Sequence, residues 1–170
     1  MRGYCGIGIF HGKTDVNVGT LLRSAQSFGA HFVFTIGRRY ARQASDTGRA
    51  VLHLPVYNFA TLDDLVAHLP AECPLVGVEL SARSRPLGTY LHPERACYLL
   101  GAEDHGLSPE AIAACHDMVE IEGGRYCLNV AVAGSVVLWD RIRKDVAVRQ
   151  DEAGEKPRRV TRLSHATSDV

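Results

Sequence analysis

Apolar and polar residues alternate along the chain in blocks whose lengths fit strands and helices in turn. Short apolar runs typical of buried strands occupy residues 4–10, 31–36, 52–59, 75–80, 96–100 and 118–121. Apolar residues at helical spacing predict helices over residues 17–28, 61–69, 109–115 and 128–144. This alternation predicts an α/β fold, with a mostly parallel sheet flanked by helices.

Residues that favour helix ends support three of these helices. Asn17 is the predicted N-cap of the first helix, and Gly29 follows its end. Thr61 precedes the second helix, and Ser108 followed by Pro109 precedes the third. The crossover over residues 81–95 is predicted to be irregular, with at most one helical turn.

One domain over residues 1–148 accounts for all of the predicted elements, and 170 residues suffice for a hydrophobic core. Residues 149–170 are charged and lack an apolar period, so we expect a disordered tail. No apolar run approaches the roughly 18 residues of a membrane span. The first run is also too short for a signal peptide, so we expect a cytoplasmic protein.

The balance of charged residues limits how the chain could bind nucleic acid. Lys and Arg together number 19, as do Asp and Glu, which argues against a grip on nucleic acid through bulk charge. Local basic patches remain, with Arg38, Arg39 and Arg42 around Tyr40 in the loop 38–42, and Arg158, Arg159 and Arg162 in the tail. These patches fit either phosphate contacts or a solvated loop and tail.

The five cysteines and eight histidines form no metal-binding pattern. Cys5, Cys73, Cys97, Cys115 and Cys127 are scattered and contain no CxxC pair. Four of them lie in or beside apolar runs, where a reduced cysteine acts as a small apolar residue. We expect no structural disulfide and no metal cofactor.

Common nucleotide and hydrolase motifs are absent, whereas three other segments are distinctive. The chain contains no GxGxxG after its first strand, no P-loop, no GxSxG and no HExxH. The distinctive segments are NVGTLLRSAQSFGA (17–30), LLGAEDHGLSPE (99–110) and YCLNVAVAGSVVLWD (126–140). Together they resemble the three motifs of the TrmH (SpoU) family in the SPOUT class of RNA methyltransferases. The resemblance extends over residues 4–144, with the motifs in the family's order.

The resemblance implies a C-terminal deep trefoil knot, an exception to the rule that chains avoid knots. It also implies S-adenosylmethionine as cofactor, held by loop backbone at the carboxyl ends of parallel strands. The implied cofactor-binding residues are Val78, Glu79, Leu100, Gly101, Ala102, Glu103, Gly106, Ile121, Cys127 and Leu128. Ligands in open α/β sheets generally occupy this edge, so the two arguments agree.

Three residues after the fifth predicted strand also have a chemical interpretation of their own. Gly101 permits a sharp turn close to a ligand, and Gly106 can adopt a positive φ. Taken alone, both glycines are equally typical of an ordinary turn. Glu103 is favourable beside a cationic sulfonium, or else is an exposed carboxylate without a ligand contact.

The resemblance implies that Arg23, Asn17 and Asn129 are the catalytic residues. Arg23 would lie at the reacting ribose, where a guanidinium can hold the adjacent phosphate and stabilise charge on the 2′-oxygen. It is not expected to act as a free base, because a guanidinium group stays protonated at physiological pH. Taken alone, Arg23 is typical of a surface arginine. Asn17 would hold the first motif loop, and Asn129 would orient the cofactor pocket or the ribose.

The chain departs from the family at two positions. Cys127 replaces the serine of the third motif, and Glu122 replaces a proline after the last strand. Cysteine is the weaker hydrogen-bond donor, so a substrate contact made by the family's serine would be weakened here.

The leading hypothesis is an RNA 2′-O-ribose methyltransferase that acts on tRNA or rRNA as a homodimer. The resemblance pairs the helix 128–144 with the first helix across a two-fold interface, so that Arg23 serves the partner's cofactor site. The alternative from another class is a non-catalytic RNA- or nucleotide-binding module that retains the knotted fold. Methylation of a base ring nitrogen is a third hypothesis, although that branch of the class uses other motifs. The RNA and the nucleotide position are not defined by the sequence.

Overall fold

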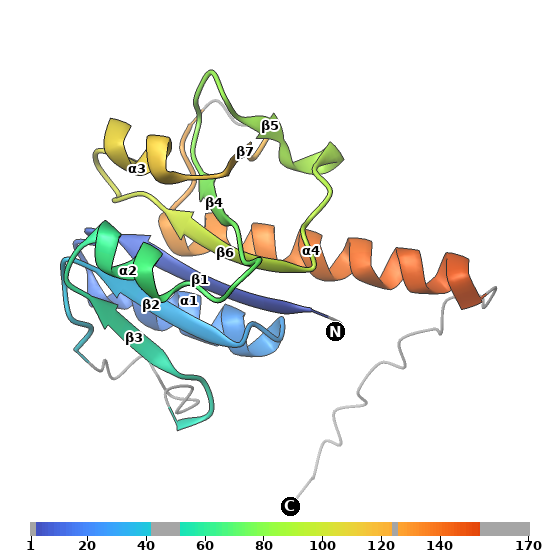
Figure 1. Ribbon diagram of the computed structural model, residues 1–170, viewed down its shortest axis with the longest axis horizontal. Coiled ribbons are helices and arrows are strands. Elements are labelled where there is room, and N and C mark those ends of the chain that lie inside the picture. Colours follow the sequence, from blue (N-terminus) through green and yellow to red (C-terminus); the bar gives the residue numbers. More distant parts are fainter. Residues whose placement is uncertain (1–2, 42–51, 124–125, 154–170) are drawn as a thin grey trace, which may run out of the picture.

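The computed structural model describes residues 3–41, 52–123 and 126–153. A seven-stranded sheet with the order β3-β2-β1-β6-β4-β7-β5 forms the centre, and every pair of neighbouring strands is parallel (Figure 1). The strands are β1 (Tyr4–Phe10), β2 (Phe32–Ile36), β3 (Val56–Phe59), β4 (Leu75–Val78), β5 (Arg85–Pro86), β6 (Arg95–Leu100) and β7 (Asp117–Glu120). The helices are α1 (Asp15–Ser27), α2 (Leu62–His68), the 3₁₀ helix η2 (Leu87–Thr89), α3 (Pro109–Ala114) and α4 (Val130–Ala153). The parallel α/β prediction is therefore confirmed.

Two layers of helices cover the sheet, with α1 and α4 on one face and α2 and α3 on the other (Figure 1). In β1 the side chains alternate between the faces, so that Ile7 and Ile9 pack in the core beneath α1 and α4. Gly6 faces the opposite side, where a Cβ atom would lie 2.0 Å from the ring of Phe32. The alternating glycines of this strand therefore give room to aromatic rings from β2.

Helices α1 and α4 lie against each other through small and apolar side chains. Leu21 is fully buried, and a Cβ atom on Gly134 of α4 would lie 2.5 Å from its Cδ1 atom. The hydroxyl groups of Ser24 and Ser135 are 2.6 Å apart, which adds one polar link between the helices. The small residues of α4 thus permit the close approach predicted from the sequence.

Two predicted helix caps are confirmed, and one is wrong. Thr61 accepts a hydrogen bond from the Asp64 amide at 3.1 Å, and the Ser108 hydroxyl accepts one from an amide in the first turn of α3. Helix α1, however, begins at Asp15 with Thr14 at the N-cap position, so Asn17 lies inside the first turn. The Asn17 side chain binds another loop and does not cap the helix.

Helix α4 is longer than predicted. It continues to Ala153, past both the predicted end at residue 144 and the predicted domain boundary at 148. Residues 145–153 contain several good helix formers, which sustain the helix without an apolar stripe. Residues 154–170 lie outside the described residues.

Smaller differences concern the edge strands. Strand β3 begins at Val56, four residues later than predicted, and the two-residue strand β5 was not predicted. The single helical turn expected in the crossover is present as η2. None of the described helices is long and apolar enough to cross a membrane. The trefoil knot and the cytoplasmic location remain predictions.

Polar side chains attach the crossover before β6 to α4. Arg141 and Lys144 donate four hydrogen bonds of 2.6–2.9 Å to backbone carbonyl groups within residues 87–94. Arg141 is buried, although its Nε atom has no hydrogen-bond partner among the described residues. The crossover is therefore fixed along the middle of α4.

Candidate functional site

The three distinctive segments meet at one edge of the sheet. Strands β1, β6, β4 and β7 are consecutive neighbours, and all of them are parallel. Their carboxyl ends therefore lie together, next to the loop residues 11–14, 101–108, 121–123 and 126–129. This is the edge where ligands generally bind in open α/β sheets.

Glu103 joins the loop after β6 to the loop after β1. Its Oε2 atom accepts a hydrogen bond from the Lys13 amide at 3.0 Å. Its Oε1 atom accepts from the Thr14 hydroxyl at 3.1 Å and from the Asn17 amide group at 2.6 Å. Partial burial acts to raise the pKa of Glu103, but these hydrogen bonds outweigh it and lower the pKa to about 2. The carboxylate is therefore ionised at neutral pH and holds the start of α1.

Asn129 extends this group to the third segment. Its Nδ2 atom donates to Asn17 Oδ1 at 3.0 Å, and its Oδ1 atom accepts from the Ala131 amide at 2.9 Å. Asn129 is thus the residue that caps α4, since its oxygen satisfies an amide in the first turn. The two asparagines and Glu103 form a continuous hydrogen-bonded group in which both amide groups have a fixed orientation.

The loop after β6 folds tightly on itself. It leaves no room for a side chain at two of its positions, and both are occupied by glycine. Ala102 and Gly106 exchange two backbone hydrogen bonds of 3.1 and 3.0 Å. A Cβ atom on Gly101 would lie 2.3 Å from the carbonyl carbon of Gly106, and Gly106 itself has a φ of 63°. Glu79 fixes the end of this loop by accepting a hydrogen bond from the Leu107 amide at 3.0 Å.

Exposed apolar side chains border the same edge. Leu80 follows β4 and is 79% exposed, while Tyr126 and Leu128 precede α4 and are 87% and 48% exposed. Strand β4 lies between β6 and β7, so these side chains belong to the same edge of the sheet as the compact loop. Glu122 accepts a hydrogen bond from the Gly88 amide at 2.9 Å, which links the last loop to the crossover.

The predicted cofactor-binding residues lie at this edge with different degrees of burial. Val78, Leu100 and Gly101 are buried at the ends of their strands. Glu79, Ala102, Gly106 and Ile121 are partly buried, and Glu103, Cys127 and Leu128 are exposed.

Arg23 is separate from this group. It lies on the exposed side of α1, and none of the described hydrogen bonds joins it to Asn17 or Asn129. The structure therefore brings two of the three predicted catalytic residues together and places the third on the outer surface of the helix.

Sequence reasoning missed the parts of this group that depend on distant contacts. Lys13 and Thr14 contact Glu103 across about 90 residues of sequence, and no local pattern signals such a pairing. Arg38, predicted as a phosphate contact, donates to the Lys13 carbonyl and pairs with Asp15 at 3.2 Å. Arg42 and the tail arginines lie outside the described residues.

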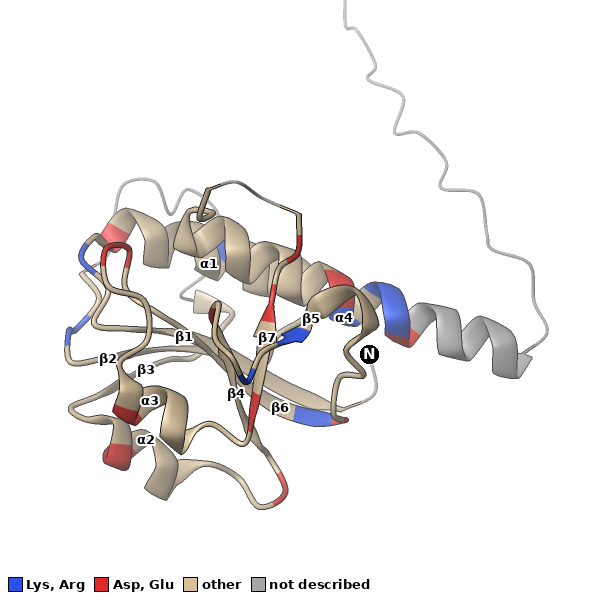
Figure 2. Cartoon of the chain, turned by 90° about the horizontal axis from the view of Figure 1, so that it is seen from above, with Lys and Arg blue, Asp and Glu red and all other residues tan. Residues whose placement is uncertain are grey.

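The described residues offer no metal centre and no uniformly basic surface. Within residues 3–41, 52–123 and 126–153, no group of three His, Cys, Asp or Glu side chains could hold a metal ion. Basic and acidic positions are interspersed over this part of the chain, although α2 and α3 carry acidic residues and no Lys or Arg (Figure 2). An anionic partner would therefore be held by individual side chains.

Two curated relatives each align with 138 residues of this chain at 29% identity. One is the tRNA (guanosine(18)-2′-O)-methyltransferase TARBP1 of Mus musculus, with 76% of this chain and 9% of the relative aligned. The other is the 23S rRNA (guanosine-2′-O-)-methyltransferase RlmB of Acinetobacter baylyi, with 75% of this chain and 55% of the relative aligned. The chain thus spans only part of the length of both relatives.

Solved structures share the fold at lower identity. An S-adenosylmethionine-bound rRNA methyltransferase from Sinorhizobium meliloti has a TM-score of 0.73 at 24% identity, over 85% of this chain and 57% of that one. The SpoU methyltransferase AviRb from Streptomyces viridochromogenes has a TM-score of 0.73 at 21% identity, over 87% and 62%. The sequence model of the SpoU rRNA Methylase family matches residues 7–139 of this chain. The chain therefore belongs to the SpoU rRNA Methylase family.

Proposed function

We propose that this chain is an S-adenosylmethionine-dependent methyltransferase that modifies a ribose 2′-hydroxyl of tRNA or rRNA. The hydrogen-bonded group of Asn17, Glu103 and Asn129 supports this proposal most directly, because it unites the three family motifs at one edge of the sheet. The names of both curated relatives describe methyl transfer to guanosine 2′-oxygens, one in tRNA and one in 23S rRNA.

The edge of the sheet has features that fit the cofactor. Gly101 and Gly106 let the loop after β6 fold tightly against its own backbone and Glu79, which gives its backbone groups a defined position for a ligand. The exposed side chains of Leu80 and Leu128 offer apolar surface for an adenine ring. The residues that would hold the cofactor are those predicted from the resemblance, between Val78 and Leu128. When bound, S-adenosylmethionine supplies a methyl group activated by its sulfonium.

The chain's own residues would orient the ribose and stabilise charge. Asn17 and Asn129 present fixed amide groups, and Glu103 keeps them in place as an ionised carboxylate. Arg23 would hold a neighbouring phosphate and stabilise negative charge on the 2′-oxygen as its proton leaves to water. A guanidinium remains protonated at neutral pH, so it suits this electrostatic role better than that of a base.

We further propose that the active form is a homodimer. Val16 of α1 and Val132 and Trp139 of α4 are 54%, 45% and 51% exposed. These two adjacent helices thus carry apolar side chains that a second copy would cover. Arg23 lies on the exposed side of α1, outside its own chain's asparagine group, which supports a role at the partner's site.

The test is methyl transfer from tritiated S-adenosylmethionine to total tRNA and rRNA, with nucleoside mass spectrometry to identify the product. We expect a 2′-O-methyl nucleoside from the wild-type protein and none from R23A, while calorimetry shows nearly unchanged cofactor affinity in R23A. R95A is the matched control, because Arg95 is exposed at the opposite end of β6. Undiminished turnover in R23A would contradict the role of Arg23. Binding of cofactor and RNA without any transfer by the wild type would instead identify a non-catalytic binding module.

Co-expression of R23A with N129A tests the arrangement across the dimer. If Arg23 acts at the partner's site, a mixed dimer contains one site with both residues intact, and transfer returns. If Arg23 acts within its own chain, neither site is intact and no activity returns.

A further inference from the structure

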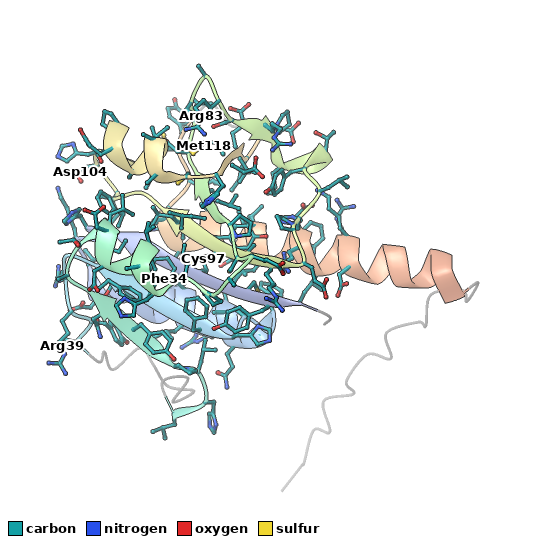
Figure 3. The ribbon with its side chains drawn as sticks, in the orientation of Figure 1. Phe34, Arg39, Arg83, Cys97, Asp104 and Met118 are labelled. Carbon is teal, nitrogen blue, oxygen red and sulfur yellow. The ribbon has the colours of Figure 1, made fainter. Side chains whose placement is uncertain are left out.

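Two adjacent arginines after β2 have different surroundings. Arg39 points away from the molecule (Figure 3) and forms no hydrogen bond or ion pair with the described residues. Arg38 is half-exposed and contacts the loop before α1, with one guanidinium nitrogen donating to the Lys13 carbonyl. Its other terminal nitrogen lies 3.2 Å from the Asp15 carboxylate, whose side chain is only 13% exposed. Arg38 and Arg39 therefore carry the same charge but differ in their contacts with the described residues.

The Lys13 backbone connects Arg38 to the candidate site. Its carbonyl accepts from Arg38, and its amide donates to Glu103 at 3.0 Å. Glu103 in turn accepts from Asn17 at 2.6 Å, and Asn17 accepts from Asn129 at 3.0 Å. A continuous chain of hydrogen bonds thus runs from the end of β2 to both candidate catalytic asparagines.

The loop between β1 and α1 has a backbone that local preferences do not favour. His11 has a φ of 50°, an uncommon value for a residue with a side chain. Its amide donates to the Ile36 carbonyl at 3.0 Å, and its ring fills the space where a Cβ atom on Gly37 would lie. A loop in this conformation needs surrounding contacts to keep it, and Arg38 supplies two of them.

We propose that Arg38 is a positioning residue, which holds Asn17 and Asn129 in place through Lys13 and Glu103, and that Arg39 contacts an RNA phosphate. This inference rests on the proposed function. To reach a phosphate, Arg38 would have to release both the Lys13 carbonyl and the partly buried Asp15 carboxylate. Arg39 gives up no described contact.

Kinetics of R38A, R38K and R39A with the RNA substrate separate the two roles. We expect R38A to lower kcat roughly tenfold or more, since small displacements at a site are costly, with little change in the salt dependence of RNA binding. R39A should raise the KM for RNA. It should also make the decline of log affinity with log salt concentration less steep, by about one in slope. R38K should recover part of the loss, because one ammonium can reach one of the two acceptors. Equal effects of R38A and R39A on KM and on the salt slope would overturn the inference.

Combining R38A with D15N tests the contact itself. If Arg38 acts through Asp15 and the adjacent loop, the double variant loses less in kcat than the two single losses predict together. Strictly additive losses would contradict an action through this contact.

Hydrogen exchange of the segment 11–18 provides a readout that does not depend on activity. We expect faster exchange in R38A, because the Lys13 carbonyl loses its Arg38 donor, and wild-type exchange in R39A and R95A. Unchanged exchange in R38A would overturn the positioning role even in an active enzyme. Faster exchange in R38A, together with a wild-type protein that methylates no RNA, would sink the proposed function and leave the structural link standing.

Discussion

His92 and Asp140 form a buried pair between the crossover and α4. Their Nε2 and Oδ2 atoms are 3.0 Å apart, and the side chains are 5% and 6% exposed. Tyr98 Oη lies 2.6 Å from His92 Nδ1 and also accepts from Arg141 at 3.1 Å. A neutral His92 with its proton on Nε2 fits both contacts, because the tyrosine hydroxyl then donates to Nδ1 and the imidazole donates to Asp140. This arrangement requires a neutral His92.

The neutral state of His92 predicts a loss of stability in mild acid. Burial lowers the pKa of His92 and outweighs Asp140, which raises it, while Arg141 and Lys144 lower it further. Below the unfolded-state pKa of about 6.5, the unfolded chain binds a proton that the folded chain resists. The contribution to stability is complete above that pH and declines as the pH falls towards the folded-state pKa.

Chemical denaturation at several pH values between 7 and 5 measures this effect. We expect the free energy of unfolding of the wild type to fall more steeply with decreasing pH than that of H92Q, which cannot bind the proton. H53Q removes an exposed histidine and should retain the wild-type slope. Identical slopes for the wild type and H92Q would show that His92 is not the responsible group.

Glu103→Gln is expected to reduce methyl transfer while the fold survives. A glutamine offers one oxygen acceptor, and its NH₂ group faces donors that the carboxylate now satisfies with two oxygens. We expect kcat to fall about tenfold or more, with a modest change in the unfolding midpoint because Glu103 is exposed. Turnover and thermal unfolding check this, and wild-type turnover would contradict the positioning role.

The low pKa of Glu103 also predicts a flat pH response from this group. Its folded-state pKa of about 2 lies below the unfolded value, so its contribution to stability is present above the unfolded pKa. That contribution declines as the pH falls below the unfolded value of about 4.5, and it is gone once the pH has fallen through about 2. Activity between pH 5 and pH 8 should therefore show no titration that disappears in E103Q. A pH dependence of wild-type activity between pH 5 and pH 8 that is absent in E103Q would contradict this expectation.

Gly106→Ala is expected to weaken cofactor binding. The residue has a φ of 63°, and an added Cβ atom would lie 2.2 Å from Glu79 Oε2. The left-handed conformation alone costs roughly 1–2 kcal/mol for alanine, and Glu79 or the loop must also move. Calorimetric titration with S-adenosylmethionine should show a higher Kd for G106A than for the wild type. A wild-type Kd in G106A would show that this loop is not part of the cofactor site.

Cys127 should be the one rapidly reactive thiol of the native chain. It is exposed, whereas Cys5, Cys73, Cys97 and Cys115 are buried. Burial raises the pKa of these four thiols, that of Cys115 to about 11, which also reduces their thiolate fraction. A chromogenic disulfide reagent should therefore modify one thiol per native chain, and all five after denaturation. C127S should show no fast phase, and a persistent fast phase in that variant would reveal another accessible cysteine.

Local sequence signals predicted some features well because those features depend on neighbouring residues. The caps at Thr61 and Ser108 involve amides three residues away. The cap assigned to Asn17 was wrong, because α1 begins at Asp15 and the Asn17 side chain binds Glu103, 86 residues further along the chain, and Asn129. The cap at Asn129 was not predicted, because the helix was expected to begin at residue 128, whereas α4 begins at Val130, directly after Asn129.

The sequence by itself determined that the chain forms a parallel α/β sheet and that three of its segments contribute to one site. Periodic burial is a local property, and parallel strands bring their carboxyl ends to one edge whatever the loops contain. Only the tertiary structure decided which polar side chains pair there, such as Arg38 with Asp15 in place of a phosphate. It also decided the burial of His92 against Asp140. A polar side chain can pair with any suitable group that the fold brings near, and that proximity depends on the whole chain.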